Sequence, residues 1–264
     1  KKLTNLDADA KPCFSASGGY ATVVIKNDEH GNGVDLQYFD TEGKPIMLAD
    51  GYSRNVRKYN ALGIQIEDIV YDVDGKPALR KDGTAGYKLE VNEKGLTEAL
   101  ICLDADLKPA MCLDGYAAWR QEFDVRGNRT KLTFCEEDGK TPLMQEGGYA
   151  GWTNVYDENG NMVEMCYFND KGEPCENNAG VYRWTAEYND RGDQIHTRNY
   201  DLSGKPVIED GKAGEDNIYD ERGNLLENKE IGVDGQLAKG RLLIRYKYDE
   251  RDNRTEASLF DRNN

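Results

Sequence analysis

Apolar and polar residues alternate along short stretches of this chain, and glycine-containing turns bound each stretch. Between residues 116 and 123, Trp119 and Phe123 fall on one face, while Arg120 and Glu122 fall on the other. This period of two indicates a β-strand, and no stretch shows the 3.6-residue period of a useful amphipathic helix. We therefore predict an almost entirely β fold with two short strands per hairpin and roughly sixteen strands in total.

The strands are joined by two kinds of turn that recur with one period. The glycine slot of the second turn falls at positions 10, 43, 75, 107, 139, 172, 204 and 235, which are 31 to 33 residues apart. The glycines of the first turn repeat with nearly the same spacing, and Asp252 occupies their eighth slot: Gly31, Gly63, Gly95, Gly127, Gly160, Gly192 and Gly223. Two independent markers with one period predict eight hairpin repeats of about 32 residues.

These repeats predict a single elongated array over residues 1–264, either solenoid-like or a coiled β-ribbon. Because the chain opens inside a repeat, we expect it to be a fragment of a longer array. The hydrophobic content of 38% suits an array with a thin core better than one compact core.

Both turns have a mechanism in the motif Asp-x-x-Gly, as at residues 157–160. The motif suits a type I turn in which the Asp side chain bonds to the backbone and Gly takes a positive φ, which closes a hairpin with a bulge. The second turn carries Ala10 and Leu107 in its glycine slot. We therefore expect that a positive φ is not strict there, and that the first turn is the tighter of the two.

The charge of the chain restricts its partners. A net charge of −15 argues against a nucleic-acid partner, whose phosphates need a basic surface, and against docking on anionic lipid. No apolar run approaches the length of a membrane span, so we expect no membrane insertion.

Catalytic and metal-binding signatures are weak in this sequence. His30 and His196 lie at different repeat positions, and no nucleophile motif or phosphate-cradling loop accompanies them. The acidic pairs near Asp72 and Asp104 are too small for a calcium site, which needs about six to eight oxygens, so we interpret them as turn stabilisers. We expect no enzymatic activity, no cofactor and no metal.

The six cysteines show no zinc spacing. Three of them occupy strand slots that suit buried small hydrophobic residues: Cys102, Cys135 and Cys166. Around the turn at 169–172, pairing Phe168 with Glu173 would place Cys166 opposite Cys175. A cross-strand disulfide is geometrically conceivable at that point.

Aromatic residues recur in three ranks. Eight residues before the first-turn glycine stand the candidate ligand-binding residues Tyr87, Trp119, Trp152 and Trp184. The rank four residues before it is Tyr59, Phe123, Tyr156, Tyr188, Tyr219 and Tyr248, and the rank eleven before it is Tyr20, Tyr52, Tyr116 and Tyr149. Same-slot rings either stack between units as core or face outward as a platform for sugar rings. The tryptophan slot leaves both alternatives open, because it changes to Asn55 and Glu215 in two other repeats.

Two motifs resemble known repeat families. Residues 156–161 and 219–224, which read YDENGN and YDERGN, resemble the tyrosine–aspartate repeats of bacterial RHS-type proteins. Residues 38–44 are similar to the hairpin repeats of choline- and glucan-binding cell-wall proteins, although the Lys-Pro after the second turn is typical of neither family. The resemblance implies hairpins that coil into a β-sheet ribbon.

Two functional hypotheses follow from the repeats and the resemblance. One is a non-catalytic module, extracellular or at a bacterial surface, that binds a protein or polysaccharide. The alternative is a passive structural stalk or shell segment with no ligand of its own.

Overall fold

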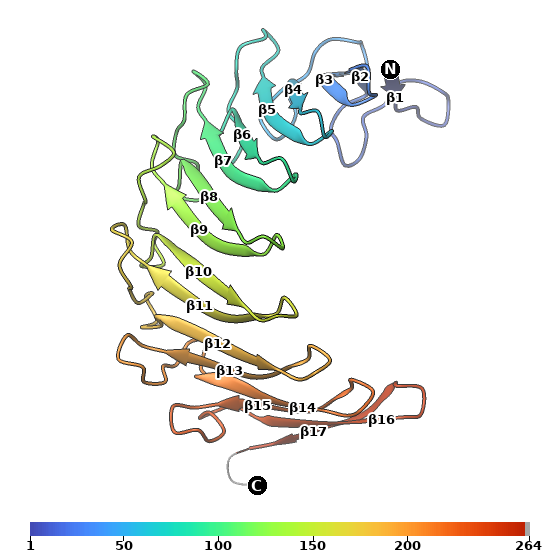
Figure 1. Cartoon of the computed structure of the whole chain (residues 1–264). Helices are drawn as coiled ribbons and strands as arrows, with labels where there is room; N and C mark the ends of the chain where they lie inside the picture. Colours follow the sequence, from blue (N-terminus) through green and yellow to red (C-terminus); the bar gives the residue numbers. More distant parts are fainter. Residues whose placement is uncertain (262–264) are drawn as a thin grey trace. The chain divides into compact units, whose positions relative to one another are not determined.

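The computed structural model describes residues 1–261, which form seventeen β-strands and no helix, so that part of the chain contains no membrane-spanning helix (Figure 1). The first strands of the repeats are β2 (Thr22–Asn27), β4 (Arg54–Tyr59), β6 (Gly86–Val91), β8 (Ala118–Phe123), β10 (Gly151–Tyr156), β12 (Arg183–Tyr188), β14 (Gly214–Tyr219) and β16 (Leu243–Tyr248). The second strands are β3 (Gly33–Phe39), β5 (Gln65–Tyr71), β7 (Thr97–Leu103), β9 (Arg129–Cys135), β11 (Met162–Phe168), β13 (Gln194–Tyr200), β15 (Leu225–Ile231) and β17 (Arg254–Phe260). The prediction of an all-β hairpin-repeat fold is confirmed.

The seventeenth strand is β1 (Lys2–Thr4), which lies outside the two-per-repeat count. It pairs antiparallel with β2, with Thr4 opposite Thr22, in the same register in which Gln37 of β3 pairs with Arg54 of β4. The strand β1 therefore occupies the place of a second strand ahead of the first hairpin.

The chain divides into two units. The first contains Lys1–Gln121 and Phe134–Leu143, and the second contains Glu122–Thr133 and Met144–Asn264. In the first unit, each strand from β1 to β7 pairs antiparallel with the next, and the series ends at β8. In the second unit, β9 to β17 pair in the same way, so strand order follows chain order in each (Figure 1).

The first turn has the geometry that its sequence predicts. The Asp157 N–H donates to the Asn161 carbonyl at 2.9 Å, and the Gly160 N–H donates to the Asp157 carbonyl at 3.1 Å. The Asp157 carboxylate accepts the N–H groups of Asn159 and Asn161 at 2.9 and 2.8 Å. Gly160 has a φ of +87°, and the register of β10 against β11 shifts just before the turn. A type I turn with a left-handed glycine and a bulge therefore closes the hairpin.

The second turn repeats this geometry, so the expectation of a looser second turn is wrong. The Asn169 N–H donates to the Glu173 carbonyl at 2.9 Å, and the Gly172 N–H donates to the Asn169 carbonyl at 3.0 Å. Ala10 and Leu107, which replace glycine in this slot, have φ values of +58° and +60°. The left-handed conformation is therefore strict in both turns, and these two residues adopt it with backbone strain.

A third turn links each second turn to the next first strand, and the sequence analysis missed it. The Gln145 N–H donates to the Tyr149 carbonyl at 2.8 Å, and the Gly148 N–H donates to the Gln145 carbonyl at 2.9 Å. Its glycines all have positive φ: Gly19, Gly51, Gly83, Gly115, Gly148, Gly180, Gly211 and Gly240. Their spacing of 29 to 33 residues matches that of the other two ranks, so the sequence carried this marker as well.

The core is thin and contains a row of small residues at one repeat position, just before each first strand. Six residues of this row, each ten before a first-turn glycine, are fully buried: Ala21, Ser53, Ala85, Ala117, Ala150 and Ala213. Larger buried side chains, such as Leu103, Cys135 and Ile231, close the far ends of the second strands. Small residues at the row allow adjacent backbones to approach closely, as a thin core requires.

The disulfide considered between Cys166 and Cys175 is not formed, and all six cysteines are free thiols. Phe168 bridges to Pro174 rather than to Glu173, and the Cys175 N–H donates to the Tyr167 carbonyl at 3.2 Å. The predicted register was wrong by one residue, because the turn bond uses Glu173. A shift of one residue removes Cys175 from the position opposite Cys166.

Candidate functional site

The four predicted site residues occupy equivalent positions, each the second residue of a first strand. Tyr87 and Trp119 lie in the first unit, and Trp152 and Trp184 lie in the second. All four side chains are half-buried, which matches neither a fully buried core nor a fully exposed platform. In the first unit β7 separates Tyr87 on β6 from Trp119 on β8, and in the second unit β11 separates Trp152 on β10 from Trp184 on β12.

Trp152 belongs to an aromatic cluster. The Tyr149 ring stacks on the Tyr167 ring with centroids 4.6 Å apart, and Trp152 meets Tyr149 edge-on at 6.0 Å. The guanidinium carbon of Arg129 lies 5.7 Å from the centroid of the Trp152 ring. This cation–π contact occupies one face of the indole.

Tyr87 borders a buried polar network. The guanidinium of Arg80 lies 5.9 Å from the Tyr87 ring centroid and forms an ion pair with Asp68. Asp68 is 5% exposed and also accepts a hydrogen bond from the Asn55 amide at 2.7 Å. Gln65 donates to the Tyr87 hydroxyl at 2.7 Å. Asn55 is therefore a satisfied core residue in the slot that Trp152 fills elsewhere, and its polarity does not indicate exposure.

Trp184 opens onto a recess with a volume of about 250 Å³. Its strand, β12, pairs with β13, and the recess continues across β13 to the third turn and the start of β14. The other lining residues are mostly polar: Gln194, Thr197, Asn199, Glu209, Asp210, Lys212, Gly214 and Glu215. An aromatic ring therefore lines the same recess as amides, a hydroxyl and charged groups.

Ion pairs position the charged groups of this recess. The Lys212 ammonium bonds to Glu215 and lies 3.4 Å from Glu230. Burial acts to lower the pKa of Lys212, but its hydrogen bond and attraction to the two glutamates outweigh burial and raise the pKa above its ordinary value. The Glu209 carboxylate accepts from the Asn177 amide at 2.7 Å. These partners hold the ammonium and the carboxylates in place as hydrogen-bonding groups.

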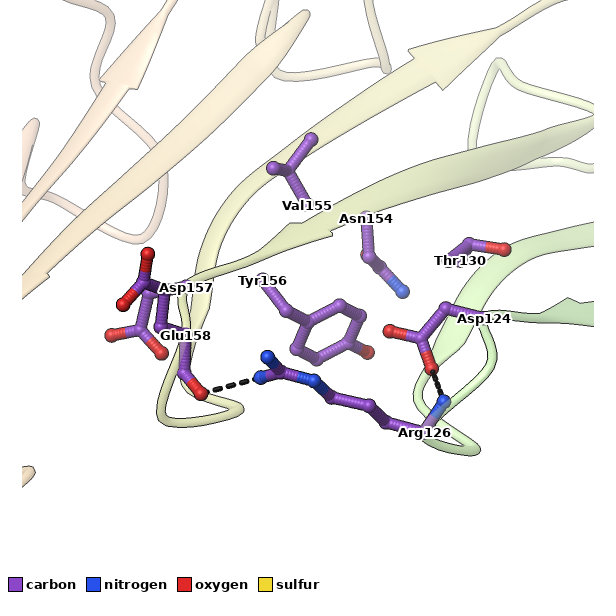
Figure 2. Close-up of a pocket in the computed structure, with 8 residues that line it drawn as sticks. All are labelled: Asp124, Arg126, Thr130, Asn154, Val155, Tyr156, Asp157 and Glu158. Atoms are coloured by element: carbon purple, nitrogen blue, oxygen red, sulfur yellow. Dashed lines mark hydrogen bonds between the residues drawn. The ribbon is translucent and has the colours of Figure 1, made fainter.

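A second recess, of about 340 Å³, lies between the first turns of two neighbouring hairpins in the second unit. Figure 2 shows the Tyr156 ring beside the long Arg126 side chain, with Asn154 directed into the space above the ring. Arg126 donates to the Glu158 carbonyl, while Tyr156 and the Asn154 amide both donate to the Arg129 carbonyl at 2.9 Å. The side chains of this recess hold one hairpin to the next.

The bond from Tyr156 recurs with the repeat. The donor is the tyrosine four residues before a first-turn glycine, and the acceptor is the carbonyl that follows the first-turn glycine of the preceding hairpin by two residues. Four repeats contain this bond: Tyr59 to Gly33 at 3.5 Å, Tyr156 to Arg129 at 2.9 Å, Tyr188 to Met162 at 3.0 Å and Tyr248 to Leu225 at 3.0 Å. Where Phe123 lacks the hydroxyl, the Gln121 amide donates to the equivalent carbonyl of Thr97 at 3.1 Å. This rank therefore joins hairpins, a role that the sequence analysis did not assign.

The recurrent aspartates act as turn stabilisers, as predicted. Asp72 accepts from the N–H groups of Asp74 and Lys76 at 2.9 Å, and Asp104 makes the same pair of bonds. At the first turn, the hydrogen bond from the Asn161 side chain lowers the pKa of Asp157. Within residues 1–261 no group of three or more metal-ligating side chains gathers.

His196 has a partner that the sequence did not reveal. Its Nδ1 lies 2.8 Å from a carboxylate oxygen of Asp216, which also receives a bond from Arg198 at 2.6 Å. Burial alone would raise the pKa of Asp216, but the bonds from His196 and Arg198 bring it below its ordinary value. Asp216 is thus an ionised member of a surface ion cluster.

Comparison with known proteins gives weak likenesses. No family model matches the sequence, and no curated protein matches it either. Among solved structures, TcdB2-TccC3 is 14% identical over 91% of this chain and 14% of its own, with a TM-score of 0.37. TcdB2-TccC3-TEV is 13% identical over 94% of this chain and 13% of its own, with a TM-score of 0.33. The Tc holotoxin pore of Photorhabdus luminescens, with a TccC3 mutation, is 12% identical over 97% of this chain and 16% of its own, with a TM-score of 0.31. The chain thus spans less than a fifth of the length of these structures.

Proposed function

We propose that the chain is a non-catalytic repeat module that binds a neutral polysaccharide at the recess beside Trp184. The observation that carries this proposal is the combination at that recess of a half-buried indole with amide, hydroxyl and ion-paired side chains. The hydrophobic face of a sugar ring packs on an aromatic side chain, and its hydroxyls need several convergent donors and acceptors.

The charge of the recess favours a neutral sugar over an acidic one. Glu209, Asp210 and Glu215 supply three carboxylates against the single ammonium of Lys212, and the whole chain carries a net charge of −15. An anionic polysaccharide would be repelled by this surface.

The neighbouring tryptophan is less suited to such a role. Arg129 covers a face of Trp152, and Tyr149 packs against its edge. The two tryptophans occupy the same repeat position. Of the two, Trp184 is the one that lines a recess to which β13 and β14 also contribute polar side chains. Trp152 therefore serves as the matched control.

The test is a titration of the whole chain with neutral gluco-, cello- and chito-oligosaccharides, followed by calorimetry. At least one series should bind saturably, and Trp184→Leu should weaken its binding by about tenfold or more, the loss expected when a buried aromatic contact is removed. Trp152→Leu should leave the affinity within about threefold of the unmodified chain. Absence of binding to any series, or equal losses in the two variants, would contradict the proposal.

The second candidate function is a passive structural segment, and the recurrent tyrosine–carbonyl bonds favour it. Those bonds join one hairpin to the next and require no ligand. A structural segment predicts that no oligosaccharide binds, while Tyr188→Phe lowers the unfolding temperature through loss of its bond to Met162. The same titration therefore distinguishes the two functions.

A further inference from the structure

Two buried thiols lie together in the first unit, apart from the recess at Trp184. Cys102, near the end of β7, is 4% exposed, and Cys112, which follows the second turn, is 9% exposed. Both are free thiols, and the binding function proposed above uses neither.

The backbone places the two side chains on the same face. Leu103 forms an antiparallel bridge with Pro109, and the Ala110 N–H donates to the Cys102 carbonyl at 3.1 Å. Ala110 therefore lies opposite Cys102. Because side chains alternate along an extended segment, Cys112 points to the same side as Ala110 and Cys102.

The next repeat holds both cysteines in place. The Cys102 N–H donates to the Ala117 carbonyl at 2.8 Å, and the Cys112 N–H donates to the Tyr116 carbonyl at 2.9 Å. The two cysteines are thus bound to consecutive carbonyls of one segment. Burial, and after it the nearby Cys112, raises the pKa of both Cys102 and Tyr116.

This pairing is a feature of one repeat. The equivalent two positions hold Val70 with Arg80 in the preceding repeat and Tyr167 with Asn177 in a later one. Burial and the neighbouring Cys112 raise the pKa of Cys102 to about 12, so the Cys102 sulfur is held as a neutral thiol.

We propose that Cys102 and Cys112 are a redox-active pair that forms a reversible disulfide by exchange with a small-molecule disulfide. The Cys112 thiolate attacks one sulfur of the reagent, which gives a mixed disulfide and releases one reagent thiolate. The Cys102 thiolate then attacks the Cys112 sulfur and expels the second reagent thiolate. Both protein protons pass to the released thiolates, so two protein thiols are oxidised and one small disulfide is reduced to two thiols.

The burial of Cys102 and Cys112 determines how fast the exchange proceeds, and the closed loop determines its effect on stability. Because both thiols are buried, exchange proceeds through opening of the segment 104–112 and is slow in the folded chain. Once formed, the bond closes a loop that contains the strained residue Leu107, whose φ is +60°. The closed loop restricts the unfolded chain and so stabilises this hairpin.

The chain supplies its own control in Cys166 and Cys175. They also flank a second turn, but the Cys175 N–H bonds to the Tyr167 carbonyl, and its thiol lies 3.7 Å from the Gly148 carbonyl. This register does not place the two sulfurs together.

The experiment equilibrates the whole chain in buffers of graded reduced and oxidised glutathione, then quenches with acid, denatures, alkylates with iodoacetamide and digests with trypsin. Cys102 and Cys112 share the tryptic fragment 95–120, because trypsin does not cut the Lys108–Pro109 bond. We expect this fragment to lose two hydrogens and both alkylation sites at a glutathione ratio about 100-fold more reducing than any ratio that oxidises Cys166 with Cys175.

Three results would overturn the proposal: fragment 95–120 doubly alkylated at every ratio, a glutathione adduct that persists on Cys112, or earlier oxidation of Cys166 with Cys175. The unmodified chain alone decides between these outcomes, so the test does not depend on a variant that folds. As a further check, Cys112→Ser should abolish the closed fragment, and Cys166→Ser should leave its formation unchanged.

Discussion

Two hairpins of the second unit fill the same three repeat slots with opposite chemistry. The aromatic set consists of Tyr149, Trp152 and Tyr167, and the charged set consists of Lys212, Glu215 and Glu230. The Tyr149 ring stacks on Tyr167 with centroids 4.6 Å apart and meets Trp152 edge-on at 6.0 Å. In the charged set, the lysine pairs with both glutamates, and Arg241 lies 3.5 Å from Glu230.

The backbone around the two sets is nevertheless the same. Gly160 and Gly223 in the adjoining first turns have φ values of +87° and +92°, and each hairpin carries the same register shift before its turn. The turns therefore determine the hairpin backbone. The three repeat positions accept either rings or charged groups, provided that the three side chains interact favourably with one another. Rings do so by burial of apolar surface, and the charged set does so by mutual neutralisation.

The largest loss of stability is expected at glycines where the backbones of adjacent strands lie very close together, which both hairpins contain. A Cβ at Gly151 would lie 2.1 Å from the Leu132 carbonyl oxygen, and a Cβ at Gly214 would lie 1.9 Å from the Thr197 oxygen. Gly151→Ala and Gly214→Ala should each lower the free energy of unfolding by about 3 kcal/mol or more, because a backbone strand must move. Chemical denaturation measures both, and a large loss in only one variant would show that the two backbones differ.

An intermediate effect should separate the two sets directly. Trp152→Ala removes a half-buried ring from its contacts with Tyr149 and Arg129, and it should cost about 2–3 kcal/mol of unfolding free energy. Glu215→Ala, in the same slot, removes a partly exposed ion-pair partner and should cost less than about 1 kcal/mol. Urea unfolding of the two variants compares them, and equal costs would mean that the charged set contributes as much as the rings.

The smallest effect concerns the turns that the two hairpins share. The folded pKa of Asp157 lies below its ordinary value of 3.8, so its contribution to stability is present above that pH and is lost as pH falls through the folded pKa. Asn60 fills the same slot and accepts the same two backbone N–H groups at 3.0 Å. Asp157→Asn should therefore leave stability at pH 7 nearly unchanged and reduce its loss in acid. Thermal unfolding between pH 2 and 7 provides the measurement, and a steeper acid loss in the variant would contradict this account.

The sequence predicted the parts of the fold that are encoded locally. The Asp-x-x-Gly motif contains both the side-chain acceptor and the left-handed residue, so the hairpins and their period followed from it. The conformation of the second turn does not follow from residue type, because Ala10 and Leu107 disfavour a positive φ, yet the hydrogen bonds of the turn enforce it. The third glycine rank was equally visible in the spacing and was overlooked.

The candidate site was less predictable because its character depends on neighbouring repeats. The indole of Trp152 is covered by Arg129, and the ring of Tyr87 is covered by Arg80, although neither arginine belongs to a repeated motif. The thiol pair was missed for a related reason. The two thiols come together through the bridge between Leu103 and Pro109, whereas the register predicted for the equivalent turn paired Phe168 with Glu173 instead of Pro174.

The most direct test of the binding account is acrylamide quenching in variants that retain one tryptophan. Trp119→Phe with Trp152→Phe leaves Trp184 as the reporter, and Trp119→Phe with Trp184→Phe leaves Trp152. The account predicts that Trp184 is quenched more readily than Trp152, and that a saturating neutral oligosaccharide protects Trp184 alone. Equal quenching of the two reporters, with no protection by any oligosaccharide, would contradict a ligand site at Trp184.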